Sequence, residues 1–278
     1  MISRLSVTLA MSATLMLAGD RAWAQLAFTT IDVPGATATF VFGINARGDV
    51  VGQYAAGVAR HGFLLSGGIL STIDFPGAGA TTSARAINAR GEIVGSYIVA
   101  GAERGFLLRD GVFSTIDVPG AAVSVPQGIN ARGEIVGFYR VGGTQHGFLL
   151  AGESFTSIDV PGATGTAAFG INARGDIVGN YTVGATEHGF LLSGGTLSAI
   201  DVPGATATGG GGISDRGEIV GFYTAAGADH GYVLSRDTFT TIDVPGATGT
   251  RARAINDRGE IVGVYLAGGT FHGVLVQD

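Results

Sequence analysis

Histidine, the side chain best suited to metal binding or proton transfer, recurs along this chain in five of its six repeats. The recurrent residues share a following glycine and are His61, His146, His188, His230 and His272. Converging imidazoles could hold a metal ion. A residue that occupies one geometric slot in every repeat lies far from its counterparts unless it lines a common axis. We therefore expect each histidine to hydrogen-bond to an Asp of its own repeat, and we expect no metal and no cofactor.

Other polar residues recur in the same way, which argues against catalysis. Asp32, Arg47, Asp49 and Tyr54 each have a counterpart in every repeat, with Glu at some positions equivalent to Asp49. Arg47 and Asp49 suit a charge pair across a hairpin or to the next repeat. Because a catalytic site needs different residues that converge at one place, no catalytic residue is predicted. The run 209–212 is all glycine but lacks the Lys-Ser/Thr of a phosphate loop.

Positions that differ between repeats are better candidates for a ligand site. Two residues before a repeated Ile stand Phe42, Arg85, Gln127, Phe169, Gly211 and Arg253. We expect the arginines among them, together with Arg251, to approach Phe40 and Phe42. Arginine forks beside aromatic rings suit an anionic or sugar-like ligand, although drift at exposed strand ends would produce the same mixture. The candidate ligand-binding residues are Phe42, Arg85, Gln127, Phe169, Arg251 and Arg253.

The elements that must position these residues follow from the repeat. Ile-Asp followed by Val or Phe and by Pro-Gly begins at Ile31, Ile73, Ile116, Ile158, Ile200 and Ile242, with a spacing of 42 residues and one spacing of 43. Each of the six copies contains four runs of β-branched, aromatic or aliphatic residues separated by Gly-rich turns, and none shows a helical period. Four short antiparallel strands in about 42 residues are typical of a propeller blade. The sequence thus predicts an all-β, six-bladed β-propeller, with an open β-solenoid as the alternative.

The order of strands within a blade is also predicted. The strand Gly43-Ile44-Asn45 carries small residues that tolerate close approach, so it belongs beside the axis. The first strand, residues 28–33, would then complete the last blade beside residues 271–276, so that both termini close the ring. Pro-Gly loops and the loops before His-Gly would emerge on one face, where variation concentrates, and the Asn-Ala-Arg-Gly turns on the other.

These motifs resemble the bacterial extracellular repeats called the HAF family. The chain reads Gly43-Ile-Asn-Ala-Arg-Gly-Asp-Val-Val-Gly52 and then His61-Gly-Phe63, with similar stretches in every later copy. It departs from the family's His-Ala-Phe in having Gly for Ala, and Ser214 and Arg104 are further departures. The resemblance implies export and a repeat fold, and it implies no general activity.

The N-terminus predicts export as well. Residues 5–19 form an uncharged apolar run after Arg4, followed by the small-x-small sequence Ala22-Trp23-Ala24. This pattern is typical of a signal peptide at 1–24 and a mature domain at 25–278, the alternative being an N-terminal membrane anchor. No later apolar stretch is long enough to cross a bilayer. We expect a secreted or periplasmic protein without a membrane span after cleavage.

Composition narrows the possible partners. The predicted mature chain has 14 arginines, no lysine and 21 acids, so nucleic acid is an unlikely class of partner by charge. No cysteine is present, so the core must stabilise the fold without disulfides. The predicted function is non-catalytic recognition, through the variable face, of a glycan, a cell-envelope component or a protein. The alternatives are an extracellular polysaccharide hydrolase or lyase with its site at the central mouth, and a structural or adhesive surface protein.

Overall fold

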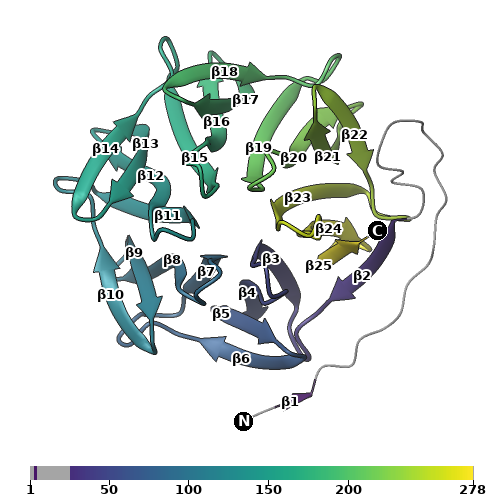
Figure 1. The fold of residues 1–278 in the computed structure, drawn as a ribbon. Coiled ribbons are helices and arrows are strands. Elements are labelled where there is room, and N and C mark those ends of the chain that lie inside the picture. Colours follow the sequence, from purple (N-terminus) through teal and green to yellow (C-terminus); the bar gives the residue numbers. More distant parts are fainter. Residues whose placement is uncertain (1–2, 5–25, 278) are drawn as a thin grey trace.

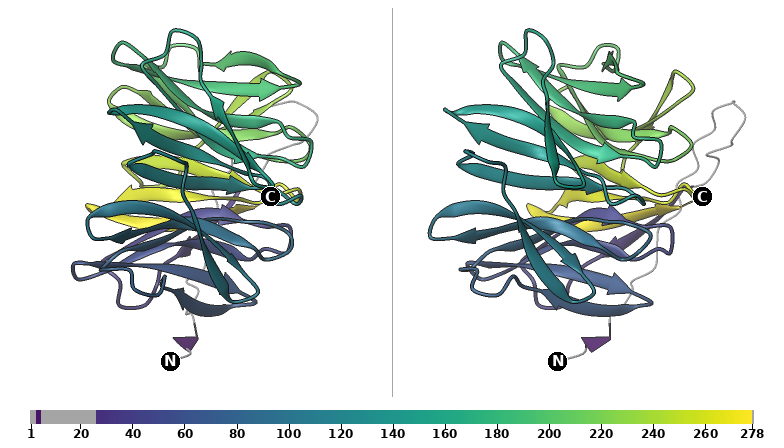
Figure 2. Two further views of the ribbon diagram at one scale, coloured as in Figure 1. Left: turned by 90° about the vertical axis from the view of Figure 1, so that its left-hand side faces the viewer. Right: turned by 60° about the vertical axis from the view of Figure 1, so that its left-hand side comes forward.

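The protein consists of β-strands grouped around a central axis (Figure 1). The computed structural model describes residues 3–4 and 26–277. Apart from β1 (Ser3–Arg4), the strands form four-stranded antiparallel units arranged as a closed ring. The fold is a β-propeller, and the alternative of an open β-solenoid is wrong. Side views show the strands running through the thickness of the ring (Figure 2). Over the described ranges, no helix is long and apolar enough to cross a membrane.

The first three units follow one another along the chain. Unit 1 contains β3 (Ala38–Ile44), β4 (Val50–Ala56), β5 (Ala59–Ser66) and β6 (Ile69–Ile73). Unit 2 contains β7 (Thr82–Ile87), β8 (Ile93–Val99), β9 (Ala102–Arg109) and β10 (Val112–Ile116). Unit 3 contains β11 (Val123–Ile129), β12 (Ile135–Val141), β13 (Thr144–Ala151) and β14 (Ser154–Ile158).

The remaining units complete the ring. Unit 4 contains β15 (Gly165–Ile171), β16 (Ile177–Val183), β17 (Thr186–Ser193) and β18 (Thr196–Ile200). Unit 5 contains β19 (Ala207–Ile213), β20 (Ile219–Ala225), β21 (Ala228–Ser235) and β22 (Thr238–Ile242). Unit 6 contains β23 (Gly249–Ile255), β24 (Ile261–Ala267), β25 (Thr270–Gln277) and the N-terminal β2 (Ala27–Ile31).

Unit 6 confirms that both ends of the domain close the ring. β2 pairs antiparallel with β25 from Ala27 opposite Gln277 to Ile31 opposite Gly273. By hydrogen bonding the strands form five sheets, because one parallel pair, Gln145 with Gly165, joins units 3 and 4. The predicted signal peptide lies outside the described residues except for β1, which pairs with β6.

The first strand of each unit lies nearest the axis, as its small residues predict (Figure 1). A Cβ on Gly170 of β15 would lie 2.9 Å from the backbone of Gly212 in β19, which is closer than real Cβ contacts allow. The second strand needs glycine for a different reason. A Cβ on Gly52 would lie 2.1 Å from the carbonyl oxygen of Phe40 and 2.7 Å from the ring of Phe63.

Hydrophobic cores lie between neighbouring units. The cluster between units 1 and 2 contains Val51, Ile73, Ile93 and Phe106, and equivalent clusters lie at the other junctions. The largest fully buried side chains include one aromatic residue from the third strand of each of the first five units, namely Phe63, Phe106, Phe148, Phe190 and Tyr232. Each unit therefore buries its apolar faces only when it has two neighbours.

A second connection between units is polar and lies in the turns that follow the first strands. The turn residues Asn45, Asn88, Asn130, Asn172, Ser214 and Asn256 form what we call the asparagine belt. Each belt asparagine donates an Nδ2 hydrogen bond to the backbone carbonyl of the next belt residue at 3.0–3.3 Å, and Asn256 closes the circle on Asn45. The side-chain oxygen of Asn45 accepts from the backbone N–H groups of Arg47 and Asp49, and this fixes its own turn.

The repeated Arg and acid hold the belt in place, and the expected charge pair forms within the turn, while the contact with the next unit is to a backbone carbonyl. Arg47 Nε lies 2.9 Å from Asp49 Oδ2, and Arg47 Nη1 donates to the carbonyl of Ala89 in the next unit. Burial by itself would raise the pKa of Asp49. Hydrogen bonds from Ser66, Asn45 and Arg47 outweigh that effect and lower the pKa.

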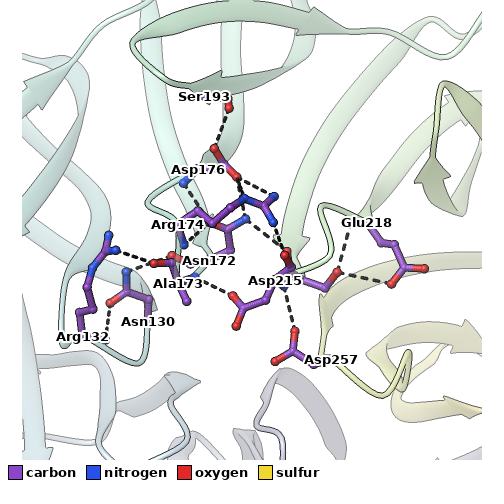
Figure 3. Close-up of polar contacts among 11 residues, drawn as sticks. Asn130, Arg132, Asn172, Ala173, Arg174, Asp176, Ser193, Asp215, Glu218 and Asp257 are labelled. Carbon is purple, nitrogen blue, oxygen red and sulfur yellow. Dashed lines mark hydrogen bonds and ion pairs between the residues drawn. The ribbon is translucent and has the colours of Figure 1, made fainter.

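Unit 5 departs from the pattern at Ser214, and aspartates add a second contact at both of its junctions (Figure 3). Ser214 has no amide to donate to unit 6, and its hydroxyl lies 3.4 Å from Glu218 in its own turn. The backbone N–H of Asp215 donates to Asp257 Oδ1 of unit 6 at 2.8 Å, and the backbone N–H of Ala173 makes the same contact with Asp215 between units 4 and 5. Both contacts use an aspartate at a position where units 1 to 4 have Ala.

Removing a belt asparagine should destabilise the whole ring. We expect Asn130→Ala to lower the free energy of unfolding by about 1–3 kcal/mol, because buried partners in two turns lose hydrogen bonds. Denaturant unfolding measures the change. Ser214→Ala is the matched control and should cost less, since Ser214 makes no such bond to unit 6. Equal losses for the two variants would contradict the role of the belt.

The belt also predicts acid sensitivity. The carboxyl groups with a lowered pKa are Asp49, Glu92, Glu134, Asp176 and Glu260. Because their pKa values lie below those of the unfolded chain, their stabilisation is present above about pH 4.5 and is lost as the pH falls through the folded values. We expect denaturant midpoints to be level from pH 7 to 5 and to fall towards pH 3. Asp49→Asn should reduce that fall, and an unchanged pH profile in this variant would count against the explanation.

Candidate ligand site in the central cavity

The variable position of the repeat is a β-bulge in every inner strand. The pairing of β3 with β4 shifts register between Val41 and Gly43, so Phe42 has no partner residue on β4. The other inner strands shift at the equivalent place. The unpaired residues, which we call the bulge residues, are Phe42, Arg85, Gln127, Phe169, Gly211 and Arg253. Because a bulge re-aims the extra side chain relative to the regular alternation, it turns this position towards the axis.

The bulge residues line a common cavity of about 130 Å³. The next two residues of each inner strand complete the lining: Gly or Ala, and then the repeated Ile. The lining contains two arginines and one glutamine but no carboxylate, imidazole or hydroxyl group. The structure thus brings together five of the six residues predicted to bind ligand. The cavity lies in the half of the channel nearest the belt turns, and so it is away from the face with the variable loops.

Arg85 is held against an aromatic stack. Its guanidinium carbon lies 4.7 Å from the ring centroid of Phe42, and the Phe42 ring is stacked on Phe40 with centroids 6.3 Å apart. Its Nε is buried and has no hydrogen-bond partner. Burial lowers the pKa of Arg85, Glu103 opposes that shift, and Arg60 adds to it. The cation is oriented by ring contacts and lacks a close counterion in the cavity.

Arg253 is the second unpartnered cation. Its Nε is also buried without a hydrogen-bond partner. Burial lowers the pKa of Arg253 to about 10, with further lowering by Arg251 and Arg85 and partial opposition from Glu187 and Asp229. At neutral pH the side chain therefore stays charged. Two guanidinium groups in one small cavity create a strongly anion-attracting environment.

Arg251 does not join this cavity, contrary to expectation. Arg251 Nη2 lies 2.5 Å from Asp229 Oδ2, and its guanidinium carbon is 4.1 Å from the ring centroid of Phe222 in unit 5. Alternation along a regular strand would give Arg251 and Arg253 the same direction. The bulge gives them different directions, because Arg253 is the residue without a partner on β24 and Arg251 is paired with Val264.

The histidines lie in the outer strands and make the predicted contact. His61 Nδ1 is 3.0 Å from Asp74, and the Tyr54 ring lies against His61 with centroids 5.3 Å apart. The other histidines pair with aspartates in the same way, and Arg104 pairs with Asp117 in unit 2. Within residues 3–4 and 26–277, no three His, Asp or Glu side chains are grouped to hold a metal ion.

Two features of the site do not follow from the sequence reasoning above. The repeated isoleucines mark the repeat, and in the structure they also line the cavity. The bulge itself was not foreseen, although its signal was present as a position that varies beside strictly repeated neighbours.

Comparison with known proteins gives the class of fold. No family model matches the chain, and no curated protein matches it in sequence. A catalytically inactive variant of virginiamycin B lyase from Staphylococcus aureus with quinupristin is 12% identical, with a TM-score of 0.53 over 91% of this chain and 100% of that one. TolB from Acinetobacter baumannii is 11% identical, with a TM-score of 0.55 over 86% and 63%.

A mutant of AofleA from Arthrobotrys oligospora is also similar, with 14% identity and a TM-score of 0.56 over 91% of this chain and 87% of that one. Identities this low carry the fold alone. The chain is a β-propeller protein with a cationic central cavity, and its resemblance to HAF repeats stays a prediction.

The unpartnered cations should cost folding stability. Because the pKa of Arg253 is lower when folded than when unfolded, its charge opposes folding at pH values below about 10. We expect Arg253→Met to raise the free energy of unfolding at pH 7 by about 1 kcal/mol, and the gain to shrink above pH 10. Arg251→Met is the matched control and should destabilise, since it removes the contacts with Asp229 and Phe222. Denaturant unfolding at pH 7 and 10.5 measures both, and a loss of stability in Arg253→Met would contradict the account.

Proposed function

We propose that this protein is an exported six-bladed β-propeller that recognises a ligand through an anionic group, without chemical turnover. The number of blades is supported by the six antiparallel units and by contacts of their inner strands in the closed order β3, β7, β11, β15, β19, β23 and back to β3. Export is supported by the sequence of residues 1–24, including the small-x-small site before Gln25. The partner is then a glycan, a cell-envelope component or a protein met outside the cytoplasm.

One observation carries the binding proposal. Arg85 and Arg253 line the same cavity, the Nε of each is buried without a partner, and the cavity lining holds no acid. A buried donor without a partner costs about 1–3 kcal/mol, and more when it is charged. An anion bound in the cavity would offset the charge of both guanidinium groups at once, which makes the cavity a site for a negatively charged group.

The alternative of a polysaccharide hydrolase or lyase has less support. Such an enzyme needs an acid and a base near the bond that it cleaves. The acids with a perturbed pKa belong to the belt, where Arg and Asn side chains hold them, and none lines the cavity. A structural or adhesive surface protein would need no unpartnered arginines in its channel.

Anion binding can be tested with acetate as the probe. We expect sodium acetate, compared with sodium chloride at equal ionic strength, to raise the melting temperature of the wild-type protein in a saturable way. Arg85→Gln combined with Arg253→Gln should weaken the apparent affinity at least 10-fold. Arg236→Gln, which alters an exposed arginine in the β21–β22 turn, should leave it unchanged. An acetate effect of equal size in all three proteins would refute the site.

A further inference from the structure

The two halves of the cavity have different chemistry. Around the ring, Arg253, Phe42 and Arg85 stand on consecutive inner strands β23, β3 and β7. Gln127, Phe169 and Gly211 stand opposite them on β11, β15 and β19. One half is therefore doubly cationic and the other is uncharged. A ligand that fills this cavity meets both halves at once.

In the cationic half the ring of Phe42 is already in contact with other side chains of the protein. Arg85 covers one side of the Phe42 ring, and Phe40 is stacked on that ring as well. Phe42 thus serves to position Arg85 and offers little free surface to a ligand. The groups left to bind are the two guanidiniums, which match one carboxylate placed between them.

In the neutral half the binding groups are free. Among residues 26–277, no aromatic ring stacks on Phe169 and no side-chain hydrogen bond engages Gln127. Gly211 adds no side chain. A Cβ there would lie 2.9 Å from the carbonyl oxygen of Arg253, so the close approach of β23 keeps this position a glycine. The neutral half therefore offers one ring and one amide, while backbone fills the place of a side chain at Gly211.

The volume of the cavity limits the size of the ligand that it can hold. Its volume of about 130 Å³ is slightly below the roughly 150 Å³ of an engineered protein cavity that holds one benzene molecule. Because this volume covers both halves, a carboxylate between the arginines leaves room beside Phe169 and Gln127 for only the near part of one six-membered ring, and the rest of the ligand would lie outside the cavity. Inorganic phosphate or acetate would occupy the cationic half alone.

Resting on the function proposed above, we infer that the ligand is a carboxylate carried on a single six-membered ring. The carboxylate accepts from Arg85 and Arg253, and the ring lies on Phe169 with Gln127 within reach of its polar substituents. Two sources share this chemistry: a uronic acid unit, whose hydroxyl groups would use Gln127, and an aromatic carboxylate, which would use Phe169 alone.

Titration of the wild-type protein with D-glucuronate, benzoate, acetate and D-glucose tests the inference. We expect glucuronate or benzoate to bind at least 10-fold more tightly than acetate, and glucose not to bind detectably. Phe169→Ala should remove that advantage, so that both ring compounds bind this variant no more tightly than acetate binds the same variant. Gln127→Leu, which keeps a similar volume, should weaken glucuronate alone and so tells the two sources apart.

Each outcome bears on a different claim. If neither ring compound binds more tightly than acetate, or if glucose binds as well as glucuronate, the inference about the ligand is wrong. Acetate binding that still depends on Arg85 and Arg253 would then leave the proposed anion site standing. Absence of binding by every anion would overturn both. Because Phe169→Ala could unfold the ring, its melting curve without ligand is compared with that of Gln127→Leu, which carries the test for glucuronate if the first variant fails to fold.

Discussion

The hydrogen bond from each belt asparagine to the next turn ties every unit except unit 5 to the unit that follows it. Each asparagine uses both ends of its side-chain amide. In Asn45 the oxygen accepts from backbone N–H groups of its own turn, and the nitrogen donates to the following unit. The contact between Asn256 and Asn45 joins residues from opposite ends of the domain, as does the pairing of β2 with β25. Closure of the ring therefore depends on contacts between the two ends of the chain, which makes it a long-range event in folding.

This belt separates the scaffold from the cavity. The belt fixes the ends of the inner strands, and small residues such as Gly170 let those strands meet closely. One residue of each inner strand is then left over as a bulge and takes no part in the pairing. Because the ladder does not depend on that residue, its side chain is free to differ from unit to unit, and the channel acquires a chemistry that the repeat does not prescribe.

The same separation explains how the ring tolerates two uncompensated cations. Arg85 and Arg253 lie where burial disfavours their charge, yet the cores between units and the belt hold the backbone in place. Buried charges that cost stability and have no hydrogen-bond partner or counterion are typical of binding sites. Arg251 is the contrasting case, since Asp229 and Phe222 satisfy it within the scaffold.

The sequence alone determined the repeat, the all-β class, the inner position of the Gly-Ile-Asn strand and the pairing of histidine with aspartate. It did so because spacing, strand propensity and turn residues act locally and recur in every copy. It also marked the bulge residues, through their variation. Only the tertiary structure decided that Arg253 enters the cavity while Arg251 leaves it, and that Asp215 and Asp257 accept hydrogen bonds from the preceding units. Those outcomes depend on register shifts and on contacts between units, and the alternation of side chains along a single strand predicts neither.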